Sequence, residues 1–217
     1  MSFLIPSAFG VRRQGRRFRI AEEKRRPCRR TPKAALLAIA LLLVGCNHQS
    51  DLPRLFPVPD ANLVDDAGKP VRLAANRGYV TVYDFIFTSC AGTCPMMTAT
   101  MRRITTKIDK EAPVRFVSIS VDPRRDSPEV LSKYAARVRN DPRWIFLTGD
   151  PNTIVHLSVD GFKLAAGADT SNPNEAILHS SKFAIADKDG TIREYYGATN
   201  DDTVDHVTAT VKDLVRE

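Results

Sequence analysis

The apolar positions after residue 60 follow two alternating patterns. Short runs rich in β-branched and aromatic residues, bounded by turn-forming residues, predict buried strands at residues 80–87, 114–121 and 144–147. After each run, apolar residues recur at helical spacing, which predicts amphipathic helices that begin near Pro95, Pro128 and Pro151. A terminal helix is marked by Val204, Val207, Val211, Leu214 and Val215. A strand, a crossover helix and a strand in this order favour a parallel sheet.

Two pairs of shorter segments predict antiparallel hairpins. Residues 62–64 and 71–73 flank one turn, and a strand beginning at Lys182 returns through the acidic turn at residues 187–190. That acidic turn lacks the downstream glutamate of a calcium-binding loop, so a plain hairpin explains it better. We therefore expect an α/β fold, with a mixed sheet flanked by helices and an N-terminal hairpin extension.

Residues 1–45 have the pattern of a signal peptide. A basic region is followed by an apolar run at residues 34–44, which is too short to cross a bilayer as a helix. Gly45 and Cys46 then resemble a bacterial lipobox, so Cys46 is expected to carry lipid; an ordinary signal peptide with a cysteine near the cut is the alternative. The proline-rich residues 46–60 predict a tether, and residues 61–217 the domain. We expect this domain in the cell envelope, outside the cytoplasm and anchored to a membrane.

The charge of the chain does not indicate a nucleic-acid partner. The formal net charge is +7, but residues 1–46 hold eleven Lys and Arg against two Glu, a net charge of +9. The other 171 residues hold 21 Lys and Arg against 23 Asp and Glu, a net charge of −2. Because the excess of basic residues belongs to the leader, binding to the phosphates of a nucleic acid loses its main support.

Two cysteines remain for the mature domain, since Cys28 lies in the leader and Cys46 is the expected lipid site. Cys90 and Cys94 lie on a turn between a predicted strand and a helix that Pro95 is expected to open. The positive end of the helix dipole stabilises their thiolates, and the spacing allows a disulfide or a shared soft metal ion. A pair of buried cysteines or a permanent bridge is the alternative, but a structural bridge has no need of a glycine-containing turn at a helix N-terminus.

A histidine is the candidate third ligand. His179 follows a polar segment at residues 165–176, which predicts an exposed loop able to close over the ends of the strands. Two thiolates and one imidazole suit Cu(I), whereas Zn(II) usually takes a fourth ligand. The alternative is a loop histidine bonded to the backbone. Asp122 is expected on the same rim, where it has a minor role in proton handling or docking, or simply caps the following helix.

The remaining histidines and the methionines have simpler expected roles. The positions of Met97 and Met101 predict core packing, and Met96, beside the apolar stripe, is expected to pack near Cys94. The other three histidines are expected at the surface: His48, His156 and His206.

Three motifs in this order resemble the Sco/SenC copper chaperones of cytochrome c oxidase assembly. They are residues 84–90 with Cys94 and Pro95, residues 117–123 with 125–128, and His179 with Ser180 ahead of the second hairpin. The resemblance implies a thioredoxin-like fold that binds one copper ion through Cys90, Cys94 and His179. The resemblance also implies two partners. One is the oxidase subunit that carries the binuclear copper site, to which the family delivers copper or whose cysteines it reduces. The other is a thiol reductant.

An enzyme remains the alternative to a metallochaperone. In a thiol-disulfide oxidoreductase, Cys90 would attack a substrate disulfide and Cys94 would resolve the mixed disulfide, with no role for a metal. Peroxide reduction of the peroxiredoxin type is a third and weaker alternative, because the two cysteines are so close in sequence.

Overall fold

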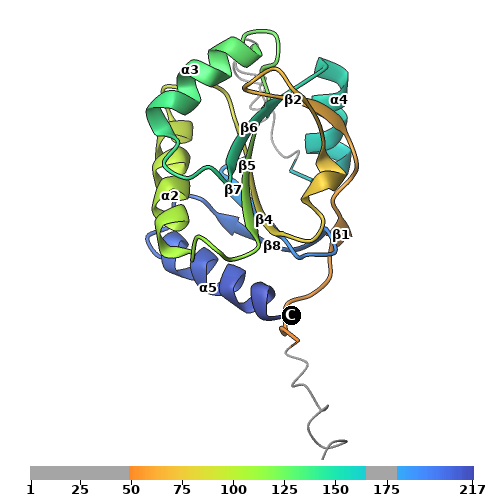
Figure 1. The fold of residues 1–217 in the computed structure, drawn as a ribbon, viewed down its shortest axis with the longest axis vertical. Helices are drawn as coiled ribbons and strands as arrows, with labels where there is room; N and C mark the ends of the chain where they lie inside the picture. The colour runs from red at the N-terminus through yellow and green to blue at the C-terminus, as the bar shows by residue number, and fades with distance from the viewer. Residues whose placement is uncertain (1–48, 165–179) are drawn as a thin grey trace, which may run out of the picture. The chain divides into compact units, whose positions relative to one another are not determined.

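One mixed sheet organises the part of the chain that the structure describes, residues 49–164 and 180–217 of this computed structural model. Its eight strands lie in the order β1-β8-β7-β4-β5-β6-β2-β3 (Figure 1). Their bounds are β1 Phe56–Pro57, β2 Asn62–Asp65, β3 Pro70–Arg72, β4 Val80–Ile86, β5 Val114–Ser120, β6 Trp144–Thr148, β7 Lys182–Ala186 and β8 Thr191–Gly197.

The three strands at the centre are parallel, as the strand-helix-strand pattern predicted. In their register Ile86 at the end of β4 lies beside Ser120 at the end of β5, so the carboxyl ends of the strands share one edge. Both expected hairpins are present and antiparallel, β2 with β3 and β7 with β8. The second turns at Gly190, whose φ of 79° lies in the left-handed region that favours glycine.

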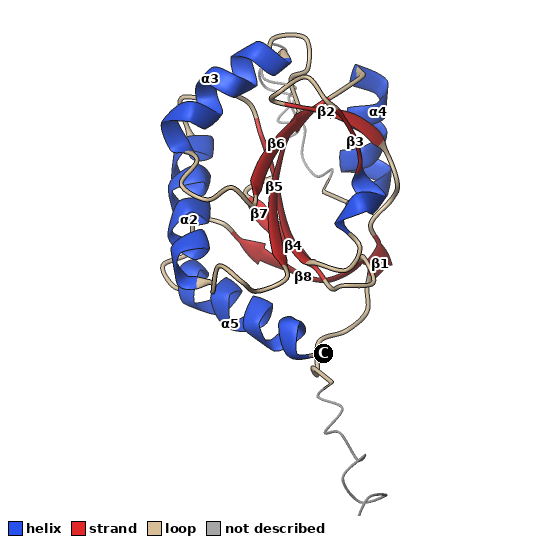
Figure 2. Cartoon of the chain, viewed as in Figure 1, coloured by secondary structure: helices blue, strands red, loops and turns tan. Residues whose placement is uncertain are grey.

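Helices cover both faces of the sheet (Figure 2). One face carries α2 Thr93–Lys107, α3 Pro128–Val138 and α5 Thr203–Arg216, and their apolar residues form one buried cluster with Val82 and Ile86 of β4. The other face carries η1 Leu73–Asn76, α4 Pro151–His156 and the single π-helical turn η2 Leu157–Gly161, which pack on Tyr83 and Phe85. The predicted α/β class, a mixed sheet flanked by helices, is confirmed.

Two of the predicted helix starts are confirmed in detail. The Ser127 hydroxyl accepts from the Val130 N–H at the start of α3, and an Asp150 carboxylate oxygen accepts from the Thr153 N–H at the start of α4. The start of α2 differs from the prediction, since the helix begins at Thr93 and Pro95 is its third residue. Proline fits there because the first N–H groups of a helix have no intrahelical acceptor.

The apolar face of α2 is buried as predicted. Met97, Met101, Ile104 and Ile108 are each at most 5% exposed. Met96 is 55% exposed, so it lies outside the buried face of the helix, and its packing near Cys94 stays a prediction.

Two of the surface histidines have different surroundings. The imidazole of His156 is exposed, as predicted, and lies 2.8 Å from an Asp160 oxygen. The imidazole of His206 is only half-exposed, because it stacks on the Tyr196 ring and its Nε2 lies 2.7 Å from a Glu194 oxygen.

Part of the expected tether is docked on the domain. Ser50 is buried, and β1 pairs with β8 in antiparallel register. The proline-rich composition predicted an extended linker, but its backbone is held by distant residues that the local pattern does not reveal. Within residues 49–164 and 180–217, no helix is both long and apolar enough to cross a membrane. The predicted signal peptide at residues 1–45, Cys46, His48 and the predicted loop at residues 165–176 lie outside the described residues.

A core methionine tests the packing of α2. Because Met101 is fully buried, Met101→Ala should lower the free energy of unfolding by about 2–5 kcal/mol through lost contacts and a residual cavity. Met96→Ala is the matched control on the exposed side and should change it by less than about 0.5 kcal/mol. Urea unfolding of the two variants measures the difference, and equal effects would contradict this packing.

Candidate metal centre

The cysteine pair lies where β4 gives way to α2. The backbone N–H of Cys90 donates to the carbonyl of Phe87 just beyond the strand, at 3.3 Å, and Cys94 lies in the first turn of α2. Cys90 is half-buried, whereas Cys94 is only 4% exposed; both are free thiols within hydrogen-bonding distance of each other. The expected strand-to-helix turn therefore brings the two sulfurs together at the carboxyl edge of the parallel strands.

The two thiols differ strongly in acidity. Partial burial of Cys90 opposes ionisation, but hydrogen bonds from the backbone and thiol of Cys94 and from the N–H groups of Gly92 and Thr93 lower its pKa below the usual value. Burial raises the pKa of Cys94 to about 12, and negative charge on Cys90 and Asp84 adds to the effect. The helix N-terminus thus favours a thiolate on Cys90, while Cys94 holds its proton.

A buried carboxylate holds the loop that carries Cys90. Asp126 is fully buried, and its oxygens accept from the Thr88 N–H at 3.0 Å, the Thr88 hydroxyl at 2.5 Å and the Ser120 hydroxyl at 2.6 Å. These bonds join the loop after β4 to the end of β5. Sequence reasoning missed this role of Asp126, because its place in a polar loop gave no sign that it would be buried.

A second buried carboxyl group lies in β4. Side chains alternate along a strand, so Asp84 faces the same side as Val82 and Ile86, toward the cluster that contains Cys94. Its Oδ1 accepts from the Ser118 hydroxyl at 2.5 Å, while Oδ2 has no hydrogen-bond partner among the described residues. Burial raises the pKa of Asp84 to about 7, despite the bond from Ser118. A charged residue inside an otherwise apolar strand was the signal that could have found this group.

Asp122 lies on the expected rim. The N–H of Val121 donates to the carbonyl of Ile86 at 2.8 Å, which places the loop after β5 beside the loop after β4. The carboxylate of Asp122 is mostly buried, and one oxygen lies 3.8 Å from Nε of Arg125. Its backbone carbonyl accepts from the N–H groups of Arg125 and Asp126, so Asp122 also shapes the turn that leads to α3.

The third candidate ligand, His179, lies outside the described residues. Among residues 49–164 and 180–217, no group of three or more His, Cys, Asp or Glu side chains is arranged to hold a metal. The described part therefore supplies two sulfur donors, which are soft and suit a soft ion such as Cu(I). The role of all three residues as ligands stays a prediction.

A family model described as SCO1/SenC matches residues 58–216, which is most of the chain. The chain belongs to the SCO1/SenC family. The SCO1 protein homolog of Bacillus subtilis (strain 168) is 33% identical over 178 residues, 80% of this chain and 91% of the relative.

Solved structures of Sco proteins share the fold. BsSco, described as a Sco family cytochrome c oxidase assembly protein with a disulfide switch, is 30% identical; the match covers 77% of this chain and 97% of that one, with a TM-score of 0.66. A SCO1/SenC family lipoprotein of Bacillus anthracis is 29% identical; the match covers 73% of this chain and 95% of that one, with a TM-score of 0.66. The ScoI protein of Arabidopsis thaliana, solved with copper bound, is 26% identical; the match covers 73% of this chain and 98% of that one, with a TM-score of 0.62. The thioredoxin-like fold that the family resemblance implied is confirmed.

The buried carboxyl of Asp84 should make stability depend on pH. Its pKa is about 7 in the folded chain, whereas the ordinary value of 3.8 applies to the unfolded chain, so the folded state binds the proton more tightly. The free energy of unfolding should therefore fall between about pH 4 and pH 7, by an amount on the order of 4 kcal/mol. Asp84→Asn should remove this slope in urea titrations, whereas the exposed control Asp201→Asn should keep it. An unchanged slope in Asp84→Asn would contradict the assignment.

The unequal acidity of the thiols should appear in their alkylation rates. At pH 7.5 the reduced chain should react with iodoacetamide at Cys90 more than about tenfold faster than at Cys94, because the thiolate is the reactive form. The single variants Cys94→Ser and Cys90→Ser isolate the two rates, and mass spectrometry follows the modification. Faster reaction at Cys94 would show that the two sulfurs are assigned the wrong way round.

Proposed function

We propose that this chain is a copper metallochaperone, which delivers copper to the binuclear copper site of cytochrome c oxidase or reduces the cysteines of that site. The observation that carries the proposal is the pair of soft, unequally acidic sulfurs at the N-terminus of α2. Copper is the cargo in this proposal, and both sulfurs bind it as thiolates, so Cys94 must release the proton that it otherwise holds. The copper-bound ScoI structure supports this choice of metal.

His179 is the proposed third ligand. Ala184 of β7 pairs with Tyr83 of β4 in antiparallel register, so β7 begins at the edge of the sheet where β4 leads to Cys90. Ser180 precedes β7 by two residues and is the described residue next to His179 in sequence. An imidazole supplied at this edge would complete a three-coordinate site with Cys90 and Cys94, which suits Cu(I).

The proposed partner is the oxidase subunit that carries the binuclear copper site, together with a thiol reductant that keeps Cys90 and Cys94 reduced. The description of BsSco as a cytochrome c oxidase assembly protein supports the first partner. The second follows from chemistry, because two sulfurs this close form a disulfide outside the cytoplasm unless a reductant or a metal prevents it.

We further propose that residues 1–45 are removed and that Cys46 carries lipid, which holds the domain at a membrane of the cell envelope. The lipobox-like ending before Cys46 motivates this proposal. The Bacillus anthracis neighbour, which is described as a lipoprotein, supports it.

The second candidate function is thiol-disulfide exchange without a metal, and the unequal acidity of the sulfurs favours it too. The Cys90 thiolate would attack a substrate disulfide and release one substrate thiolate. The deprotonated Cys94 would then attack the mixed disulfide, leaving a Cys90–Cys94 disulfide and a substrate reduced by two electrons. The disulfide switch identified in BsSco supports this candidate.

Copper titration of the reduced domain tests the main proposal. Competition with a Cu(I) chelator should show one tightly held ion per chain, and Cys90→Ser or Cys94→Ser should abolish this binding. His179→Ala should weaken copper binding at least about tenfold. Loss of a side chain that only orients a metal ligand already lowers metal affinity about tenfold or more, and loss of the ligand itself should cost no less. The control His156→Ala changes an exposed histidine paired with Asp160 and should have no effect.

The same variants separate the two candidates. Failure of the reduced domain to hold copper would overturn the metallochaperone, and unchanged affinity in His179→Ala would remove that residue from the site. Rapid turnover on a model disulfide that is insensitive to His179→Ala, in a chain that holds no copper, would instead establish the oxidoreductase.

A further inference from the structure

A buried arginine fastens the N-terminal segment to the domain. Arg193 of β8 is 2% exposed, and its guanidinium donates to two acidic side chains, to the Ser50 hydroxyl at 3.0 Å and to the carbonyls of Leu52 and Pro53 at 2.7 and 3.1 Å. The acidic acceptors are Asp187 at 3.2 Å and Glu217 at 2.8 Å. We call these residues the Arg193 clamp.

Further bonds extend the Arg193 clamp along the segment. The Ser50 N–H donates to Glu217 at 2.7 Å, and the N–H groups of Leu55 and Val58 donate to carbonyls of the β7–β8 hairpin at 2.9 and 2.8 Å. The side chain of Arg54 pairs with Asp189. Residues 50–58 are therefore part of the domain and cannot act as a spacer.

The Arg193 clamp lies at the end of the sheet opposite the cysteines. The N–H of Gly78, two residues before β4, donates to the carbonyl of Lys188 in the β7–β8 turn, and the Lys188 ammonium donates to the carbonyl of Val215. The cysteines follow the other end of β4, whose seven residues span about 23 Å. Figure 1 shows the end of α5 and β1 at this clamp end of the sheet.

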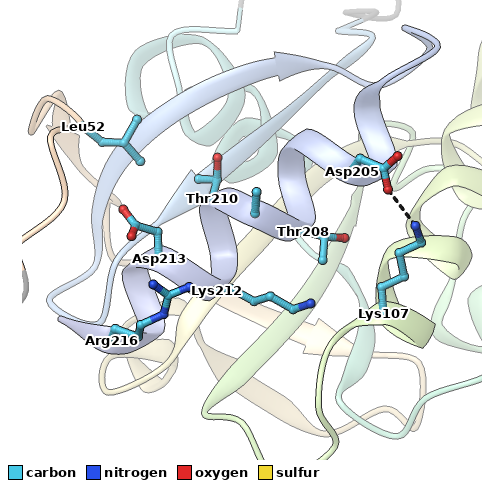
Figure 3. A pocket seen from close by; sticks show the side chains of 9 residues that line it. Leu52, Lys107, Asp205, Thr208, Thr210, Lys212, Asp213 and Arg216 are labelled. Carbon is cyan, nitrogen blue, oxygen red and sulfur yellow. Dashed lines mark hydrogen bonds and ion pairs between the residues drawn. The ribbon is translucent and has the colours of Figure 1, made fainter.

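The surface at this end combines charged and apolar side chains. Leu55 and Phe56 are 38% and 41% exposed. A groove along α5 is lined by Leu52, Lys212, Asp213 and Arg216, and at its far side Lys107 bonds with Asp205 (Figure 3). Charges of both signs beside exposed apolar side chains fit a phospholipid headgroup layer, in which basic groups meet phosphates and apolar groups reach the acyl boundary.

We propose that this end of the domain, formed by residues 50–56 and the last turns of α5, rests on the phospholipid surface, with the Cys90–Cys94 site held at the opposite end. The inference rests on the proposed lipid at Cys46. From Cys46 to Ser50 the chain advances by four residues, which reach at most about 14 Å when fully extended. Because the Arg193 clamp fixes Ser50 on the domain, this end of the domain stays within about 14 Å of the lipid on Cys46. The cysteines, at the opposite end of the sheet, then face away from the membrane.

Energy transfer from a fluorophore on the full, lipidated chain to acceptor-labelled lipid tests the orientation. The dye is attached to Lys212→Cys or to Ala91→Cys, each in a chain that also carries Cys90→Ser and Cys94→Ser. The labelled chains are then bound to vesicles of equal parts phosphatidylcholine and phosphatidylglycerol. Both labelled positions are exposed, and Ala91 lies in the cysteine loop. Transfer should be several-fold greater from position 212 than from position 91. Equal transfer would overturn the inference.

Variants of the Arg193 clamp test its part in this arrangement. Arg193→Met, or the milder Glu217→Gln if the first fails to fold, should raise the rate of trypsin cleavage after Arg54 and reduce the difference in transfer between positions 212 and 91. Arg143→Met is the matched control, since that arginine pairs with Asp141 and makes no contact with the segment. Clamp variants that keep both the native cleavage rate and the native transfer would overturn the role of Arg193.

Two further measurements separate this inference from the proposed function. Mass spectrometry that finds no lipid on Cys46 would overturn both the anchor and the orientation, while copper binding by the domain would be untouched. A lipidated chain that holds copper but shows equal transfer from both positions would overturn the orientation alone.

Discussion

The three hydrogen bonds accepted by the Asp126 carboxylate hold together the two loops from which the site is built. They tie Thr88, just beyond β4, to Ser120 at the end of β5. The cysteines themselves contribute little to holding this geometry, because neither forms a covalent bridge. A buried carboxyl group bonded to one backbone N–H and two hydroxyl groups is a directional anchor, so it fixes the loop that leads through Cys90 to the first turn of α2.

The fold and the position of the cysteine pair followed from the sequence because they depend on local regularities. Apolar runs, helical spacing and capping residues such as Ser127 and Asp150 each act within a few residues, and the structure confirmed the elements they predicted. A strand that leads into a helix also dictates that Cys90 and Cys94 lie at the end of the sheet. No distant contact was needed for either conclusion.

The parts that the sequence did not reveal depend on partners far away in the chain. Asp126 bonds to a residue 38 positions earlier, and Ser50 bonds to a residue 167 positions later. His206 was expected at the surface and instead stacks on Tyr196, which belongs to another element. Composition alone made residues 46–60 resemble a free linker, because nothing local shows that Arg193 is buried beneath Ser50.

Cys90 is half-buried and Cys94 is buried, so an exchange of ligands at this pair of sulfurs takes place in a fixed order. If the two sulfurs hold the proposed copper ion, an incoming thiolate reaches Cys90 first, and Cys94 stays bound while the bond to Cys90 is exchanged. In that order of exchange the ion would remain attached to at least one sulfur of this chain until the acceptor holds it.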